Sequence, residues 1–121
     1  MDVILNVLIV GLAAAFLWSR LSPTKGVNNI TTVELREMMK LKKAGNQFID
    51  VRTPGEFKGN HIRGFKNIPL QQLGRRIGEL SKDKEVIVIC QSGMRSSRAS
   101  KLLKKAGFQK ITNVKGGMSA W

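Results

Sequence analysis

The stretch "EVIVICQSGMRSSRAS", residues 85–100, decides the fold, because an apolar run ends there in a short polar loop. The run "EVIVI" is rich in β-branched residues and lacks polar alternation, which is typical of a strand buried on both faces of a parallel sheet. A helical pattern begins around Ser96 and stops at Gly107. This order predicts that Cys90 lies at the carboxyl end of a strand, where open α/β sheets bind their ligands.

Strand and helix patterns alternate on both sides of this stretch. A helix is predicted from Thr31 to Gly45, and it begins with a capping box in which Glu34 follows Thr31. Further strands are predicted at 27–30, 47–51, 65–69 and 110–114, a helix at 70–80, and a glycine turn leading to a final helix at 115–121. The sequence therefore predicts an α/β fold, a parallel sheet with helices on both faces.

The composition limits the possible partners and chemistry. The chain has one cysteine and one histidine, so an internal disulfide is excluded and no Cys/His metal site is expected. A single free thiol is typical of a reducing compartment. The formal net charge of +13 favours anionic partners. Aromatic residues are few and tyrosine is absent, so we expect no nucleic-acid partner.

The N-terminal stretch "VILNVLIVGLAAAFLW", residues 3–18, carries no charge and only one amide. We expect residues 1–21 to form a transmembrane helix that anchors the protein in the cell membrane, with Trp18 and Arg20 at the interface. The alternatives are a cleaved signal peptide, with "AAA" at 13–15 as its cleavage site, and a buried core helix. No positive residue precedes the run, which disfavours the signal peptide.

Charge asymmetry predicts the orientation of this segment. No lysine or arginine precedes it, and several follow it: Arg20, Lys25, Arg36, Lys40, Lys42 and Lys43. Positive residues stay on the cytoplasmic side, so the sequence predicts a single-pass membrane protein whose domain lies in the cytoplasm. The stretch "SPTKG", residues 22–26, predicts a linker, because proline and glycine interrupt helices. The domain is then expected at 27–121.

The loop after the central strand can hold a reactive thiol beside an anion. A short connection between a strand end and a helix start points several backbone N–H groups at one place, and the helix dipole adds to their field. Gly93 permits the tight backbone path. The same field lowers the pKa of a cysteine thiol, here Cys90. Arg95 offers a bidentate grip on an oxyanion.

Attack by sulfur on an anionic substrate fits two classes of reaction. In sulfur transfer, the loop amides need only surround a persulfide. In phosphate ester hydrolysis, they must surround the equatorial oxygens of a phosphoryl group, which requires a wider loop. Four residues separate Cys90 from Arg95, one fewer than in cysteine phosphatases. The spacing therefore favours sulfur transfer, with a cysteine phosphatase or arsenate reductase as the enzymatic alternative.

Three motifs, in order, resemble those of the rhodanese family. "CQSGMRS", 90–96, resembles its active-site loop, Cys-x-x-Gly-x-Arg-Ser/Thr. "DVRTPGEFKGNHIRGFKNIP", 50–69, resembles its upstream signature, although Asn60 replaces a glycine and Phe65 an alanine. "VKGGMSAW", 114–121, resembles its C-terminal Gly-Gly-x-x-x-Trp. The resemblance implies a rhodanese-like sheet and a sulfurtransferase of the thiosulfate:cyanide type.

The resemblance also implies residue roles. Cys90 is the nucleophile that carries the persulfide. The loop residues Gln91, Ser92, Gly93, Met94, Arg95 and Ser96 bind the substrate. Arg95 either binds the anionic donor or pairs with a carboxylate to hold the loop. Asp50 and Arg52 brace the site, and Glu56 and His61 are expected to pair with each other or to cap a helix.

The partners implied are a small anionic sulfur donor such as thiosulfate and a thiol or protein acceptor. The membrane is expected as a further partner through the N-terminal helix. No metal or organic cofactor is required by this chemistry. The non-enzymatic alternative is a membrane-bound adaptor that uses the same fold to bind other proteins.

Overall fold

Parallel strands form the centre of the molecule. The computed structural model describes residues 3–21, 26–41 and 45–121, and side chains throughout these ranges except at 17–21. The strands are β1 (Val27–Ile30), β2 (Gln47–Asp50), β3 (Lys66–Asn67), β4 (Val86–Ile89) and β5 (Ile111–Val114). They pair in the order β1–β5–β4–β2–β3, and every pair is parallel. The predicted parallel sheet is confirmed, with β4 at its centre.

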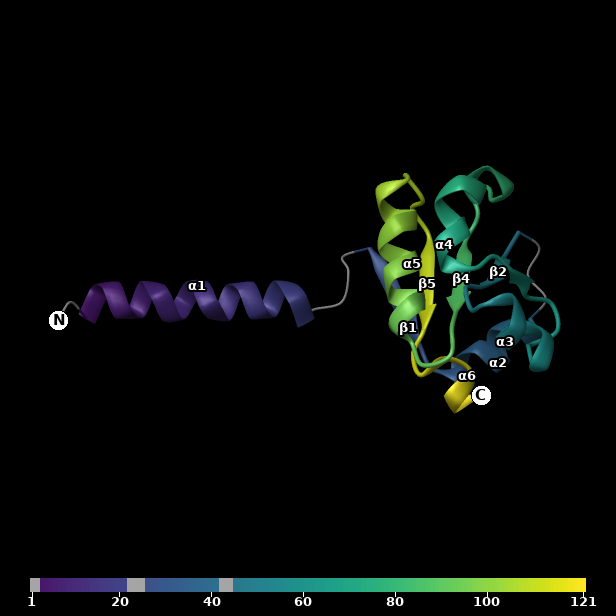
Figure 1. Cartoon of the computed structure of the whole chain (residues 1–121), viewed down its shortest axis with the longest axis horizontal. Helices are drawn as coiled ribbons and strands as arrows, with labels where there is room; N and C mark the ends of the chain where they lie inside the picture. The colour runs from purple at the N-terminus through teal and green to yellow at the C-terminus, as the bar shows by residue number, and fades with distance from the viewer. Residues whose placement is uncertain (1–2, 22–25, 42–44) are drawn as a thin grey trace.

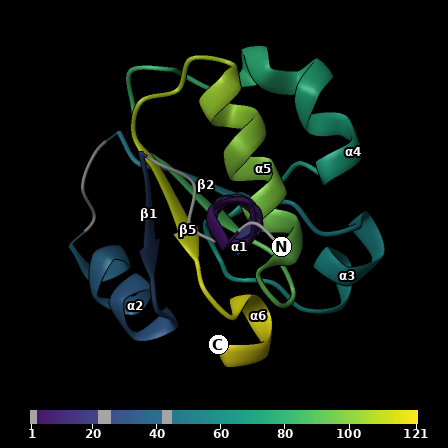
Figure 2. The ribbon, with the colours of Figure 1, turned by 90° about the vertical axis from the view of Figure 1, so that its left-hand side faces the viewer.

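Helices cover both faces of this sheet. The helical elements are α1 (Val3–Leu21), α2 (Thr32–Lys40), α3 (Pro54–Gly59), α4 (Leu70–Leu73), the 3₁₀ helix η1 (Gly74–Glu79), α5 (Met94–Lys105) and α6 (Gly117–Ala120). Figure 1 shows α2, α3, α4, α5 and α6 around the sheet and α1 apart from it, and Figure 2 shows α2 and α5 on opposite sides of β1 and β5. The predicted helices on both faces are confirmed.

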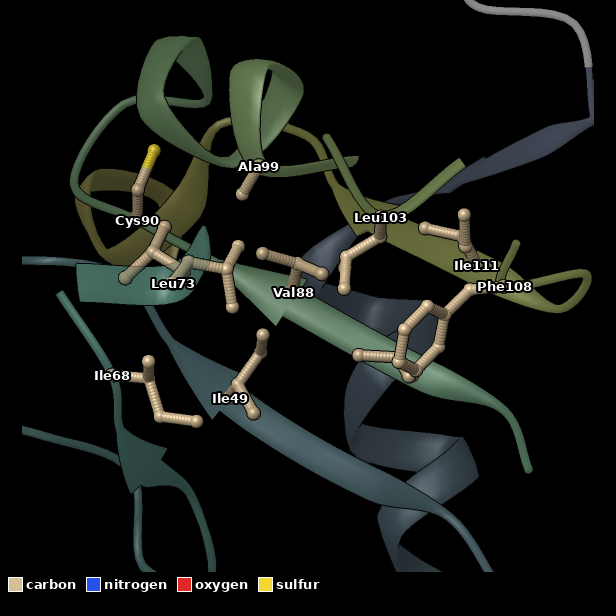
Figure 3. Packing of buried hydrophobic residues seen from close by; sticks show 11 residues of the cluster. Ile49, Ile68, Leu73, Val88, Cys90, Ala99, Leu103, Phe108 and Ile111 are labelled. Atoms are coloured by element: carbon tan, nitrogen blue, oxygen red, sulfur yellow. The ribbon is translucent and has the colours of Figure 1, made fainter. Parts of the chain in front are cut away.

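Two apolar clusters explain why β4 lacks polar alternation. Val86, Val88 and Cys90 point to the face covered by α4 and α5, where they pack with Leu103 and Phe108. Ile87 and Ile89 point to the opposite face and join Leu35 and Val114 in a second cluster. Figure 3 shows the first cluster, with Leu73, Leu103 and Phe108 packed over the strands. Both faces of β4 are buried, so both sets of side chains are apolar.

Local signals set several element boundaries. The capping box predicted at the start of α2 is present, with Thr31 and Glu34 bonding each other's backbone N–H groups. The helix predicted over 70–80 instead becomes 3₁₀ from Gly74, because two glycines lower its α-helical propensity. The helix α5 begins at Met94, two residues earlier than predicted, directly after the left-handed Gly93.

The prediction of a membrane anchor is wrong. No helix among the described residues is long and apolar enough to cross a membrane. The described side chains of α1, residues 3–16, are exposed. The predicted localisation as a single-pass membrane protein is corrected accordingly. The proposed interfacial roles of Trp18 and Arg20 fall outside the described side chains.

Other sequence predictions near the N-terminus also fall outside the described residues. Residues 22–25 of the predicted linker are not described, and its last residue, Gly26, has a positive φ directly before β1. Lys25, Lys42 and Lys43, which the orientation argument used, are likewise outside the described part of the chain. The predicted boundary of the domain at residue 27 stays a prediction.

Candidate active site

Cys90 follows β4 directly and is buried, with 1% of its surface exposed. Its Sγ accepts a hydrogen bond from the Gly93 N–H at 3.0 Å and lies 3.4 Å from Ser96 Oγ. Figure 3 shows the sulfur directed toward the start of α5 and away from Ile49 and Ile68. The thiol therefore lies where the loop amides and the helix N-terminus converge.

The surroundings of Cys90 have opposing effects on its acidity. Burial raises the pKa of the thiol, because a low-dielectric environment disfavours the thiolate. Hydrogen bonds from the Ser96 hydroxyl and from the backbone N–H groups of Ser96, Gly93 and Ser92 outweigh burial, so the pKa lies below its usual value. In the neutral thiol, the Ser96 hydroxyl donates to the Gly93 carbonyl at 3.1 Å. Deprotonation frees this hydroxyl to turn and donate to the thiolate.

Gly93 gives the loop its shape. Its φ of 104° lies in the left-handed region, which L side chains rarely adopt. This conformation turns the Gly93 N–H toward the sulfur at the residue before α5 begins. Its neighbours Ser92 and Met94 are exposed, and Gln91 is half-buried. The loop thus surrounds the sulfur with its backbone and leaves two side chains in solvent.

Arg95 pairs with a carboxylate from another element. Its guanidinium donates two hydrogen bonds to Glu56 in α3, at 2.6 and 2.9 Å. The hydrogen bonds from Arg95 and from the Thr53 backbone lower the pKa of Glu56 to about 2. Of the two roles suggested for Arg95, this geometry matches the second, in which the arginine holds the loop against the rest of the domain.

Glu56 is the residue whose importance the sequence did not reveal. It was expected to pair with His61 or to cap a helix, and it does cap α3 through a capping box with Thr53. His61 instead contacts the Phe57 carbonyl at 2.7 Å and stacks on the Phe57 ring. The "Thr-x-x-Glu" pattern at 53–56 could have located the cap, but nothing local could have indicated that the same carboxylate bonds Arg95.

Asp50 and Arg52 form a buried pair at the end of β2. The Arg52 guanidinium donates to both carboxylate oxygens of Asp50, at 2.9 to 3.1 Å, and the two side chains are almost fully buried. It also donates to Gln91 Oε1 at 3.3 Å and to the Asn60 carbonyl. Arg52 thereby connects the end of β2 to the first loop residue after Cys90.

The C-terminal glycine turn holds the other side of the loop. The N–H groups of Met118 and Ser119 donate to the carbonyls of Cys90 and Gln91, at 2.8 and 2.9 Å. A Cβ on Gly117 would collide with the Cys90 carbonyl. Glycine is therefore required where α6 approaches the loop backbone this closely.

The described residues contain no group of three or more histidine, cysteine, aspartate or glutamate side chains that could hold a metal ion. The groups that converge on Cys90 are hydrogen-bond donors rather than ligands. The arrangement can stabilise a thiolate and an anion bonded to it.

Comparisons with known proteins agree with this geometry. A family profile described as "Rhodanese-like domain" matches residues 31–121. "Thiosulfate sulfurtransferase GlpE" of Shewanella oneidensis is 30% identical over 93 residues, covering 77% of this chain and 90% of that protein. A crystal structure of a rhodanese-like domain protein from Staphylococcus aureus superposes with a TM-score of 0.72 at 32% identity, covering 78% of this chain and 90% of that one.

A further relative is more similar over a shorter region. "Uncharacterized protein YqhL" of Bacillus subtilis is 51% identical over 75 residues, which are 62% of this chain and 60% of that protein. A "Putative sulfur carrier protein YrkF" of the same species is 42% identical over 73 residues, covering 60% of this chain and 40% of that protein. The match spans less than two thirds of the length of either relative.

Proposed function

Because this chain belongs to the rhodanese-like domain family, we propose that it is a sulfurtransferase that carries sulfane sulfur as a persulfide on Cys90. Relatives named as sulfurtransferases and as a putative sulfur carrier support sulfur transfer in general. The observation that carries the finer proposal is the set of hydrogen-bond donors around the Cys90 sulfur. We place this activity in residues 27–121, which contain the sheet and the loop.

The first step loads the sulfur. The Cys90 thiolate attacks the outer sulfur of a small anionic donor such as thiosulfate and forms a new S–S bond. The donor's own S–S bond breaks, and its electron pair leaves with sulfite. The N–H groups of Gly93 and Ser96 and the Ser96 hydroxyl then stabilise the negative charge of the persulfide, as they stabilise the thiolate.

The second step discharges the sulfur. An acceptor thiolate attacks the outer sulfur of the Cys90 persulfide, the bond to Cys90 breaks, and its electron pair returns to Cys90 as the thiolate. No electrons are gained or lost overall, so neither step requires a redox cofactor. The loop is held in place by hydrogen bonds to its neighbours. Arg95 bonds Glu56 in α3, and Arg52 at the end of β2 bonds Gln91.

The test uses the full chain with thiosulfate and cyanide and measures thiocyanate. The wild type is expected to turn over, and Cys90→Ser is expected to be inactive. After thiosulfate alone, mass spectrometry should show one added sulfur atom on Cys90. A wild type no faster than Cys90→Ser would refute the proposal. Turnover of an aryl phosphate that is faster than sulfur transfer from thiosulfate would favour the phosphatase alternative, and an inert Cys90 would favour the adaptor alternative.

A further inference from the structure

A cationic hollow adjoins the active-site loop between α5 and the end of β5. It has a volume of about 620 Å³, and its lining includes Gly93, Met94, Arg98, Lys101, Asn113 and Lys115. This volume lies within the range of sites for small molecules, roughly 300–1,000 Å³. The hollow is therefore large enough for a compact ligand.

All the charged side chains that line the hollow are positive. Arg98 and Lys101 lie three residues apart on α5 and so share one face of the helix, and Lys115 follows β5. All three side chains are exposed. Within the described residues, none of the three forms a salt bridge and no carboxylate lines the hollow. These cations thus differ from Arg95, whose charge is paired within the protein.

The wall also contains a polar atom without a partner. The Asn113 side chain is buried and donates to Asn29 Oδ1 at 3.0 Å, but its own Oδ1 accepts no hydrogen bond from the described residues. If both amides turn over together, Asn29 becomes the donor and the Asn113 NH₂ becomes the unpaired group.

The hollow adjoins the loop that surrounds the sulfur of Cys90. Gly93 lines the hollow, and its N–H is also the donor that lies 3.0 Å from Cys90 Sγ. Met94, which is 69% exposed, follows it at the start of α5. A molecule bound by the three cations therefore lies against the residues that surround the sulfur.

We propose that this hollow binds the anionic end of the sulfur acceptor, which is a small thiol bearing at least two carboxylate or phosphate charges. The inference rests on the proposed function, because it assigns a substrate class to the second step. The Cys90 persulfide anion first takes up a proton from solvent. The acceptor thiolate then attacks the outer sulfur of Cys90–S–S–H and forms a new S–S bond, while the bond to Cys90 breaks and its electron pair returns to Cys90 as the thiolate. The product is the acceptor's own hydropersulfide, so atoms, charge and electrons balance.

The experiment loads the full chain with thiosulfate, removes excess donor, and follows loss of the persulfide. Cysteamine, 2-mercaptoethanol and mercaptosuccinate serve as cationic, neutral and dianionic acceptors, each rate being corrected for its thiolate fraction. Mercaptosuccinate is expected to react about tenfold faster than 2-mercaptoethanol, and cysteamine more slowly, because the cations concentrate the dianion near the sulfur. Equal corrected rates for the three thiols would overturn the proposal.

Matched variants distinguish an effect of the cations in the hollow from an effect of the overall positive charge. The triple variant R98Q/K101Q/K115Q should lose most of the preference for mercaptosuccinate and keep its rate with 2-mercaptoethanol. The control K82Q/K105Q/K110Q removes the same number of exposed positive charges at positions outside the hollow and should keep the preference. A preference lost equally in both variants, or retained in the first, would overturn the assignment to this hollow.

A binding measurement keeps this inference distinct from the proposed function. Cys90→Ser cannot carry a persulfide, yet it retains the hollow. Titration of this variant with succinate, a dianion without a thiol, should shift the backbone amide NMR signals of Arg98, Lys101 and Lys115. Shifts without persulfide formation in the wild type would refute the sulfur chemistry and leave the anion site standing. No shifts at these amides would refute the anion site alone.

Discussion

At the scale of single residues, Cys90 combines burial with a lowered pKa. Burial alone would make the thiol less acidic, and the donors that offset it all come from the six residues that follow. Ser96 matters most among them, because its hydroxyl is the leading cause that lowers the pKa. The acidity of the nucleophile therefore depends on one short segment of backbone and one serine.

Ser96→Ala should raise the pKa of Cys90. A hydrogen bond to a charged group contributes about 1.5–3 kcal/mol, and its loss disfavours the thiolate relative to the thiol. The rate of Cys90 alkylation by iodoacetamide, measured against pH, should show its midpoint displaced upward. Ser100→Ala is the control, because the Ser100 hydroxyl bonds the Ser96 carbonyl and does not contact the sulfur. An unchanged midpoint in Ser96→Ala would contradict the prediction.

Contacts between residues that are close in the sequence could be predicted, and contacts between distant residues could not. Cys90, Gly93 and Ser96 lie within seven consecutive residues, so the strand, the glycine and the helix start indicate their arrangement. The Arg95–Glu56 pair joins residues 39 positions apart. Its existence depends on how α3 and α5 pack, and no local pattern encodes that packing.

At the scale of elements, the loop is held from three directions. Glu56 ties it to α3, Arg52 ties it to the end of β2, and the α6 amides bond its carbonyls. The glycine pair before α6 allows the closest of these approaches. The loop after β4 is therefore positioned mainly by contacts with α3, with the end of β2 and with α6, all of which are distant from it in the sequence.

Glu56→Gln should lower the free energy of unfolding at neutral pH. It should also make that free energy fall less as the pH is lowered. The folded-state pKa of Glu56, about 2, lies below its ordinary value of 4.5. The stabilisation is therefore fully present above pH 4.5 and is lost as the pH falls toward 2. Because the pair is about one-third exposed, the loss at neutral pH should be about 1 kcal/mol in the free energy of unfolding.

Urea unfolding at a series of pH values measures this effect, and thiocyanate formation measures its consequence for the loop. Glu79→Gln is the matched control, because Glu79 also has a pKa lowered to about 2, mainly by Arg76, but belongs to η1. It should change acid stability and leave turnover unchanged. Full turnover in Glu56→Gln would show that Arg95 does not need this partner.

Gly117→Ala should disturb the loop from the side of α6. The new Cβ would collide with the Cys90 carbonyl, and the positive φ of Gly117 adds strain. We expect a loss of about 1–3 kcal/mol in stability and slower persulfide formation, measured by thermal unfolding and by mass spectrometry. Gly78→Ala is the control, because nothing lies near its added Cβ. Wild-type persulfide formation in Gly117→Ala would contradict the role given to α6.

At the scale of the whole molecule, the pattern of apolar residues correctly predicted the sheet and wrongly predicted that the N-terminal helix crosses a membrane. The apolar runs at β2, β4 and β5 are short and bounded by turns, so a buried parallel sheet was the arrangement they allowed. An apolar run is also typical of a membrane span, and length decides between the two readings. No helix among the described residues is long and apolar enough to cross a membrane, which overturned the prediction.

The net charge of +13 should make loading by an anionic donor depend on salt. Raising the ionic strength from about 0.01 to about 1 M shortens the Debye length from roughly 30 to 3 Å. The KM for thiosulfate should rise several-fold while kcat changes little, because steering affects encounter rather than the chemical step. Discharge of the persulfide by 2-mercaptoethanol is the control, and its rate should vary less, because its attacking thiolate carries one negative charge and thiosulfate carries two. A KM independent of salt would contradict the prediction.

Cys90 is the only cysteine in the chain and is almost completely buried. A persulfide formed there cannot be resolved by a second thiol of the same molecule, since the chain has none to form a disulfide. Its lifetime is then set by how often an outside acceptor arrives. Under the proposed function, the protein would therefore store one sulfur atom and release it at a rate set by the concentration of the acceptor.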